Sequence, residues 1–517
     1  MHNRPEARRV VPRWRTSIIT AQTDEAKTTK PAVRRDLSEE VALKEREFTS
    51  HCSVPIASEL MFLASEAGLA DVARKAANVI IANEEKIGGR QLVKTAKKIL
   101  GTDAEERVQA SGADFVKEAR KHLLADYRNP VLLMDVARAL TVEQHEKSAL
   151  RYVRAAVAMA PQSRFVVRAA ARYYLHIGEH EIAHDLLRST PLLKSDPWIQ
   201  ASEIAVATVR GRTSSLVKQN LRRLLDEKRI GGDQSELASA LATVEYLNGG
   251  DKKAKQLFQK ALLHPNDNSL AQAEWAASKL RLIVNDDALR TPLSYEANSH
   301  NAYRKLQIEE AISHALAWVD DEPFGSRSHD ALCYLYSLDG QYERAQKAVE
   351  AAIKVDGKES FHLRLNLLFA KIQNGDLDDA FDQLIVLARL PEARTHSTQL
   401  LANAGALAYA AGELEYARDY YERSIRIAKA KNLPEIEALA RAFYARCATI
   451  AGDPNASAIV SESAAKVQHL PSAGAIYVVR SLVGDGVRGR LDATASQRVR
   501  KRQWTWDMAS NTLNSVE

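Results

Sequence analysis

The feature that most constrains the fold of this chain is one spacing that recurs along the sequence. In each occurrence a Gly is followed by an Ala five residues later and by an apolar residue nine residues after the Gly. The Gly can adopt a positive φ and so end one helix, and the step of four residues places the Ala and the apolar residue on one face of the next helix. The occurrences begin at Gly178, Gly249, Gly340, Gly375 and Gly412. The spacing therefore predicts a repeated unit of helix, tight turn and helix.

The repeat has a readable period. Gly340 and Gly375 are 35 residues apart, and Gly375 and Gly412 are 37 apart. Gly405 adds a small residue seven positions before Gly412, inside the preceding amphipathic stretch. A further unit that lacks the Gly is marked by Ala149, Val153 and Ala156. At these positions the chain resembles the tetratricopeptide repeat (TPR) family, whose unit is a pair of antiparallel helices of about 34 residues.

The resemblance implies an all-α fold, a TPR-like α-solenoid of stacked antiparallel helix pairs that form a right-handed superhelix. The repeat frame is strongest in residues 130–192 and 326–431. Helices that keep the frame poorly are expected in residues 88–129, 193–234 and 270–325. We expect a basic, mostly disordered N-terminal tail, then the solenoid, then a basic C-terminal tail with tryptophans, at residues 1–53, 54–480 and 481–517.

Charge is concentrated at the N-terminus. The formal net charge is +6, and residues 1–35 hold nine Lys or Arg against three acidic residues, so the rest of the chain is close to neutral. The body is therefore not a nucleic-acid-binding surface by its charge, and any such activity belongs to the ends. The Arg-rich start weakly resembles a transit peptide. No apolar run approaches the roughly 18 residues that a membrane helix needs, so we expect no membrane span.

The cysteines indicate a reducing compartment. Cys52, Cys333 and Cys447 lie far apart, and none belongs to a C-x-x-C pair. This usage provides neither a disulfide framework nor a thiolate metal site. We therefore expect a cytoplasmic protein without a cofactor.

One motif suggests an enzyme. His180, Glu181 and His184 form the H-E-x-x-H pattern of zinc metallopeptidases, and Glu203 follows 19 residues later, where gluzincins place a third ligand. The TPR-like repeat explains Glu181 without catalysis, because the family places acidic residues after the turn Gly. The chain also lacks the upstream exopeptidase segment of the gluzincin aminopeptidases. We interpret the motif as a buried or groove-lining histidine pair and expect no enzyme; a zinc peptidase and adventitious metal binding are the alternatives.

The resemblance also implies a binding face. In the TPR family the first helix of each pair lines a groove that holds a peptide or a partner helix. Arg138, Arg168 and Arg172 occupy inward-facing positions of two consecutive first helices. A guanidinium fork suits a carboxylate, so the expected ligand is an acidic or C-terminal peptide segment of a protein partner. The alternative is that these arginines pair with local acids on a solvated face.

The C-terminal tail combines positive charge with aromatic rings, which are the ingredients of nucleic-acid contact. The residues are Arg498, Arg500, Lys501, Arg502, Trp504 and Trp506. Trp14 lies between Arg13 and Arg15 in a similar way. A tail docked on its own solenoid, or a short motif read by a partner, would explain the same residues. The sequence therefore predicts a non-enzymatic scaffold or adaptor that binds proteins, with a nucleic-acid-associated adaptor as the alternative.

Overall fold

The computed structural model describes most of the chain and divides it into two compact units. These are the N-terminal unit, Val10–Asn266, and the C-terminal unit, Asp267–Glu517. The described residues are 11–15, 37–50, 52–66, 69–83, 90–100, 112–125, 128–227, 230–356, 360–483, 503–507 and 512–516.

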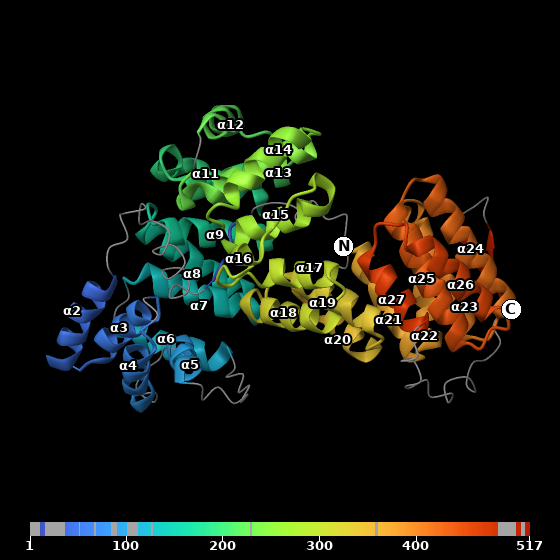
Figure 1. Cartoon of the computed structure of the whole chain (residues 1–517), viewed down its shortest axis with the longest axis horizontal. Helices are drawn as coiled ribbons and strands as arrows, with labels where there is room; N and C mark the ends of the chain where they lie inside the picture. Colours follow the sequence, from blue (N-terminus) through green and yellow to red (C-terminus); the bar gives the residue numbers. More distant parts are fainter. Residues whose placement is uncertain are drawn as a thin grey trace. The chain divides into compact units, whose positions relative to one another are not determined.

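The N-terminal unit is built from α-helices (Figure 1). Its α-helices are α2 (Leu37–Ser50), α3 (Val54–Glu66), α4 (Ala70–Ala82), α5 (Arg90–Leu100), α6 (Gly112–Ala125), α7 (Pro130–Val142), α8 (Glu146–Met159), α9 (Arg164–His176), α10 (His180–Ser189), α11 (Pro197–Val209), α12 (Leu216–Asp226), α13 (Ser235–Leu247) and α14 (Asp251–Ala261). Two 3-10 helices, η3 (Pro191–Lys194) and η4 (Gly232–Gln234), precede α11 and α13.

The C-terminal unit is also helical, with one small hairpin near its end (Figure 1). Its α-helices are α15 (Asp267–Leu280), α16 (Asp286–Leu289), α17 (Tyr295–Arg304), α18 (Ile308–Asp321), α19 (Ser326–Asp339), α20 (Tyr342–Asp356), α21 (Phe361–Asn374), α22 (Leu377–Ala388), α23 (Ser397–Ala410), α24 (Leu414–Ala430), α25 (Pro434–Ile450), α26 (Ala456–Val467) and α27 (Ala473–Val483). The 3-10 helix η5 (Pro391–Arg394) precedes α23. Strands β1 (Gln503–Asp507) and β2 (Thr512–Val516) pair antiparallel and are an addition to the predicted all-α fold.

Consecutive helices pack as pairs in both units, which confirms the predicted TPR-like α-solenoid. The pairs that pack most extensively are α3–α4, α7–α8, α13–α14, α17–α18, α19–α20, α23–α24 and α25–α26, and α9–α10 and α21–α22 also pack together. The first helices of successive pairs also contact one another, as α7 does α9 and α21 does α23. We call the surface that these first helices form the first-helix face of a unit.

The turns inside the pairs explain the recurrent glycine. The repeat glycines have φ between 77° and 82°; they are Gly178, Gly249, Gly340, Gly375 and Gly412. Two pairs make the same turn without Gly: Gln144 joins α7 to α8 with φ 63°, and Leu306 joins α17 to α18 with φ 64°. Ala149 and Ala311 follow these residues by five positions and are fully buried. The repeat frame thus continues where the sequence does not show its glycine.

The small residue predicted in a first helix is required by close packing. A Cβ added at Gly405 in α23 would lie 2.6 Å from Cδ2 of Tyr421 in α24, well inside van der Waals contact. Tyr421 is itself buried, with 1% of its surface exposed. The α23–α24 pair therefore depends on the absence of a side chain at Gly405.

The last helices of the C-terminal unit pack back onto earlier ones. Arg446 in α25 is buried and donates hydrogen bonds to the main-chain oxygens of Ser337, at 3.0 Å, and Leu338, at 2.7 Å, at the end of α19. The main-chain N–H of Gly474 in α27 donates to the hydroxyl of Tyr303 in α17 at 3.0 Å. Helices α25 and α27 therefore cover part of the first-helix face at α17 and α19.

Two stretches within the predicted N-terminal tail have defined structure. Residues 11–15 form neither helix nor strand, yet Trp14 is fully buried. Helix α2 adds Val41 and Phe48 to a hydrophobic core shared with α3, α4 and α5. The rest of residues 1–53 lies almost wholly outside the described residues, and for it the disordered tail stays a prediction. Among the described helices, none has the length and the apolar character required to cross a bilayer.

Candidate functional site

The most informative site of the N-terminal unit is the place where residues 11–15 meet α7 and α9. The ring of Trp14 contacts Tyr173 of α9 edge to face, with centroids 5.9 Å apart and an interplanar angle of 84°. The main-chain oxygen of Trp14 accepts a hydrogen bond of 3.1 Å from Nε of Arg138 on α7. A segment 124 residues away in the sequence is thus held like a bound peptide. We call Trp14, Arg138 and Tyr173 the Trp14 site.

The aromatic wall of the Trp14 site is fixed by its own helix pairs. Tyr173 is 1% exposed, and its hydroxyl donates to the main-chain oxygen of Glu146, in α8, at 3.1 Å. Its burial, with the nearby charge of Glu146, raises the pKa of Tyr173 to about 12, so the phenol stays neutral. Tyr174 meets the same ring edge to face at 5.6 Å. The wall is therefore preorganised for an incoming aromatic side chain.

Basic side chains flank the buried tryptophan. Arg15 is 5% exposed and Arg13 is half-buried. A buried guanidinium keeps its charge and is stable only with polar or charged partners. On α7, the buried Asp135 lies three residues before Arg138, so the two side chains project from the same side of the helix. The site therefore combines an aromatic wall with both signs of charge.

The free energy of docking the segment is closely balanced. Burying an indole of roughly 150–250 Å² contributes about 4–6 kcal/mol, and the bond from Arg138 adds about 1 kcal/mol. Fixing the backbone of a five-residue segment costs roughly 1–2 kcal/mol per residue. Burial of Pro12 and Arg15 adds to the gain, so gain and cost are of similar size and the net free energy of docking is the small difference between them.

The arginines predicted to contact a partner lie on two neighbouring first helices. Arg138 is on α7, and Arg168 and Arg172 are on α9. The guanidinium of Arg168 donates to Oε1 of Glu236, on α13, at 2.6 Å, and these side chains are 12% and 1% exposed. Arg138 binds a main-chain oxygen and not a carboxylate. The structure therefore places the three arginines on one face, while their contact with a partner stays a proposal.

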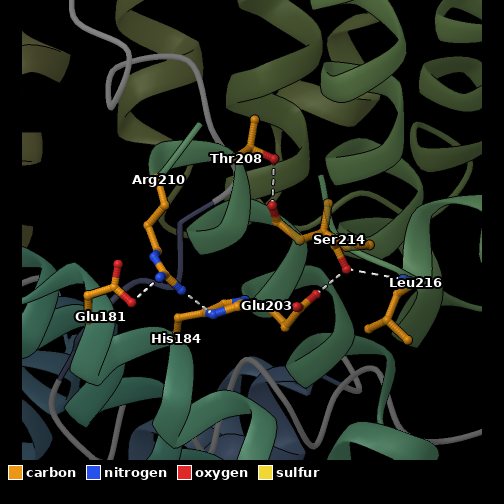
Figure 2. Close-up of polar contacts among 8 residues, drawn as sticks. Glu181, His184, Glu203, Thr208, Arg210, Ser214 and Leu216 are labelled. Atoms are coloured by element: carbon orange, nitrogen blue, oxygen red, sulfur yellow. Dashed lines mark hydrogen bonds and ion pairs between the residues drawn. The ribbon is translucent and has the colours of Figure 1, made fainter. Parts of the chain in front are cut away.

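The H-E-x-x-H motif belongs to a polar cluster in the same unit (Figure 2). Nε2 of His184 lies 3.1 Å from Oε1 of Glu203 on α11. Arg210, just after α11, bonds both Nδ1 of His184 and the carboxylate of Glu181, and it holds the pKa of Glu181 below its usual value. Because arginine can only donate, Nδ1 of His184 must accept, and Nε2 carries the proton donated to Glu203.

The cluster ends at a serine but does not form a nucleophilic triad. The hydroxyl of Ser214 donates to Oε2 of Glu203 and accepts a hydrogen bond from the main-chain N–H of Leu216 at 3.1 Å (Figure 2). In a serine nucleophile the imidazole lies between the hydroxyl and the acid. Here the carboxylate of Glu203 lies between the hydroxyl and the ring of His184, so the order does not suit acyl transfer.

The geometry of the motif also disfavours a zinc peptidase. A zinc ligand needs a ring nitrogen with an available lone pair, yet Nδ1 of His184 already accepts from Arg210, a permanent cation. Glu203, at the spacing of a third ligand, accepts from His184 and Ser214. Within the described ranges, no group of three or more His, Cys, Asp or Glu is placed to hold a metal ion. The structure favours the interpretation of His184 as a buried packing residue, while His180 is half-buried at the start of α10.

The predicted contacts of the C-terminal tail divide into two groups. The basic residues Arg498, Arg500, Lys501 and Arg502 lie outside the described residues. Trp504 and Trp506 lie in β1, opposite Ser515 and Leu513 of β2.

Only part of the Trp14 site can be predicted from the sequence. The run Arg13, Trp14 and Arg15 is compatible with nucleic-acid contact, with a motif read by a partner and with a tail docked on its own solenoid, and the structure shows Trp14 docked. Tyr173 and its neighbour Tyr174 were visible as aromatic residues of a first helix. Their meeting with Trp14 depends on two segments more than 150 residues apart, and no local pattern encodes such a contact.

Comparisons with known proteins do not assign this chain to a family. No family model matches the chain, and a search of curated proteins finds no match. Solved structures similar to the chain include a human IFIT1 dimer with m7Gppp-AAAA, at 17% identity and a TM-score of 0.31, covering 76% of this chain and 94% of that one. The APC/C hetero-tetramer Cut9–Hcn1 has 12% identity and a TM-score of 0.29, covering 90% and 99%. Yeast Tom70 has 11% identity and a TM-score of 0.28, covering 77% and 85%.

TM-scores this low carry no argument about the fold, the ligands or the partners of this chain. The fold assignment rests instead on the packed helix pairs and on the positive φ of the glycines that join them. On that basis the chain is a TPR-like helical-repeat solenoid.

Proposed function

We propose that this chain is a non-enzymatic scaffold that binds protein partners on the first-helix face of its N-terminal unit. The observation that supports the proposal most strongly is the Trp14 site, where α7 and α9 hold a non-helical peptide segment. The bond from Arg138 goes to a main-chain oxygen, which every peptide has. A face that recognises the main chain together with one anchoring side chain suits the reception of segments from other proteins.

The C-terminal unit is less suited to this role. Its helices α25 and α27 occupy part of the first-helix face at α17 and α19, through the bonds of Arg446 and Gly474. Phe443 of α25 also packs edge to face on Phe369 of α21, at 5.0 Å. A peptide would have to displace these contacts, so we assign partner binding to the N-terminal unit.

We propose Arg138, Arg168 and Arg172 as the residues that a partner segment contacts. An acidic or C-terminal segment would place its carboxylate near the guanidinium groups on α9. That carboxylate would compete with Glu236 for Arg168, because those two side chains already form an ion pair. Arg138 would bind the main chain of the partner, as it does that of Trp14.

The test is a capture experiment with matched variants of the full chain. The double variant Arg138→Ala with Arg172→Ala removes contacts on the first-helix face. The control, Arg151→Ala with Arg154→Ala, removes two exposed arginines of the second helix α8. Proteins captured from a lysate by the wild type should be depleted for the first variant and retained by the control. Equal capture by both variants would contradict the assignment to this face, and an absence of reproducible partners would contradict the scaffold.

The alternative of a nucleic-acid-associated adaptor stays a prediction that concerns the tails. Binding to RNA or DNA that weakens with rising salt and is lost when both ends are removed would favour it. Salt-independent capture of protein partners would favour the scaffold.

A further inference from the structure

We propose that the Trp14 site is a receptor for basic peptide segments with a central tryptophan, and that residues 11–15 are its built-in occupant. The inference rests on the proposed scaffold function and adds a second ligand class on its first-helix face: it concerns the Trp14 site alone and is separate from the acidic segment proposed for Arg168 and Arg172. A partner that carries such a segment would bind by displacing the chain's own N-terminal segment, so binding and release of this segment would control the site.

The buried groups define the ligand. Trp14 is fully buried against the edge-on ring of Tyr173, and a smaller apolar side chain would lose most of that contact. Its neighbour Arg15 is also buried, at 5% exposure. On α7, the buried Asp135 lies one turn before Arg138, the residue that binds the main chain of Trp14. Tryptophan as an anchor, followed by a guanidinium, is therefore the chemistry that this site selects.

The contact made by Arg138 explains why the occupant can be exchanged. Its Nε donates to the main-chain oxygen at position 14 and would make the same bond to any peptide in this register. The segment adds no helix or strand to the unit, and α7–α8 and α9–α10 are complete pairs without it. A peptide from another protein can therefore replace it without breaking the solenoid.

Covalent attachment favours the built-in occupant. A tethered ligand meets its site at an effective concentration in the millimolar range. A free peptide of identical sequence must therefore compete poorly with it in the wild type and bind readily once the tethered tryptophan is removed. This difference between tethered and free peptide is the measurable signature of the proposal.

The experiment uses the full-length chain and a fluorescent peptide with the sequence of residues 9–18. Binding is followed by fluorescence anisotropy to the wild type and to the Trp14→Ala chain. We expect at least tenfold tighter binding to Trp14→Ala, because tethering multiplies effective affinity by about 10²–10⁴. A peptide with Trp14→Ala should not bind. An acidic peptide of equal length tests the other ligand class: if it displaces bound peptide 9–18 more readily than unlabelled peptide 9–18 does, the proposed chemistry of the Trp14 site is overturned.

A second substitution tests the receptor side. Adding Arg138→Ala to the Trp14→Ala chain removes one hydrogen bond and should weaken peptide binding by roughly fivefold to tenfold. Arg151→Ala, on the exposed side of α8, is the matched control and should leave binding unchanged. Peptide affinity that is the same for wild type and Trp14→Ala, or unaffected by Arg138→Ala, would overturn the proposal.

A cleavage experiment applies if the Trp14→Ala chain does not fold. A specific protease site is inserted after residue 20 of the otherwise native chain, and the chain is cut after folding. The released N-terminal peptide should co-elute with the body and should be displaced by excess synthetic peptide 9–18, but not by its Trp14→Ala form. A peptide that separates at once, or one that excess competitor never displaces, contradicts an exchangeable occupant.

The outcomes separate this inference from the scaffold function. Failure of peptide 9–18 to bind, with partner capture still sensitive to Arg138→Ala and Arg172→Ala, overturns only the ligand chemistry. Failure of both experiments overturns the scaffold proposal as well.

Discussion

Among single residues, His184 takes its role from side chains that the H-E-x-x-H motif does not contain. Arg210, 26 residues later, occupies one ring nitrogen, and Glu203 occupies the other. Glu181, the general base of such a motif in a peptidase, is instead an exposed partner of the same arginine. The sequence of the motif matches a catalytic pattern, but its side chains are hydrogen-bonded to Arg210 and Glu203 in a structural cluster.

Replacing His184 with Ala should lower the free energy of unfolding by about 1–3 kcal/mol, because Glu203 and Arg210 would each lose a buried partner. Thermal unfolding of wild type and variant, with and without EDTA, measures this. The chelator should leave the melting temperature of the wild type unchanged, and His180→Ala should have the smaller effect of a half-buried residue. A melting temperature that EDTA lowers only while His184 is present would revive the zinc alternative.

Glu274 makes the C-terminal unit sensitive to pH. Burial, only partly offset by the charge of Arg304, raises the pKa of Glu274 to about 7 from a usual 4.5. Between those values the folded unit binds more protons than the unfolded chain, so stability should fall as the pH rises from about 4.5 to about 7. The loss is about 3 kcal/mol at most. Denaturant unfolding across this range should show the decline in wild type, and Glu274→Gln should abolish it. A decline that persists in the variant would contradict the assignment.

His176 should give the N-terminal unit the opposite dependence. Burial, with the charge of Arg172, lowers the pKa of His176 to about 4 from a usual 6.5. Between those values the unfolded chain binds more protons, so stability should fall as the pH drops from about 6.5 towards 4. Hydrogen exchange of α9 at several pH values checks this, and His176→Gln should flatten the profile. An unchanged profile in the variant would show that another group titrates there.

At the scale of elements, the residue type favoured at the turn inside a helix pair is determined by its left-handed backbone conformation and not by side-chain contacts. Gly340 has φ 77°, and a Cβ added there would meet nothing within 4 Å. Gln144 makes the equivalent turn with φ 63° and an exposed side chain. At both positions a substitution changes the backbone strain of a left-handed residue without changing side-chain packing.

Substituting Gln144 with Gly should raise the free energy of unfolding of the N-terminal unit by about 0.5–1 kcal/mol, because the cost of a left-handed conformation disappears. Gly340→Ala should lower that of the C-terminal unit by about 1 kcal/mol for the same reason. Denaturant midpoints of the two variants against wild type give both values. If both substitutions changed the free energy of unfolding in the same direction, the positive φ would not be what determines the stability of these turns.

Element-scale features were the most predictable part of the fold. Gly, Ala and apolar residues at fixed spacing are local signals, and they located the pairs around Gly178, Gly340 and Gly412. The frame was missed near Leu306, where a non-glycine residue makes the turn. The candidate site was less predictable, because the meeting of Trp14 with Tyr173 depends on the folded unit and not on either segment alone.

At the scale of the whole molecule, the division into two units localises the effect of the N-terminal segment. Trp14 and its partners on α7 and α9 all lie in the N-terminal unit. Trp198, 1% exposed in α11 of the same unit, provides a comparison within a helix. The two tryptophans are equally buried, but Trp14 belongs to a segment outside the helix pairs that can undock, whereas Trp198 is part of a packed helix.

Trp198→Ala should cost about 3–5 kcal/mol, as expected for a large core side chain. Trp14→Ala should cost less than about 2 kcal/mol, because docking of its segment is closely balanced. Hydrogen exchange by mass spectrometry reports each unit separately, and α7 and α9 should lose protection while the C-terminal unit is unaffected. Equal losses for both variants would make Trp14 a permanent core residue and contradict an exchangeable occupant.

The packing of α25 against the end of α19 also affects folding during synthesis, because α19 is made well before α25. Arg446 is made 108 residues after the oxygen of Leu338 that it binds. At about 5–20 residues per second, the ribosome needs roughly 5–20 s to cover that distance. Until α25 and α27 have been made, the nascent α17 and α19 lack the apolar side chains Ala438, Ala442 and Val478, which complete their core. The pace of translation between α19 and α25 thus determines how long the half-made unit is open to aggregation.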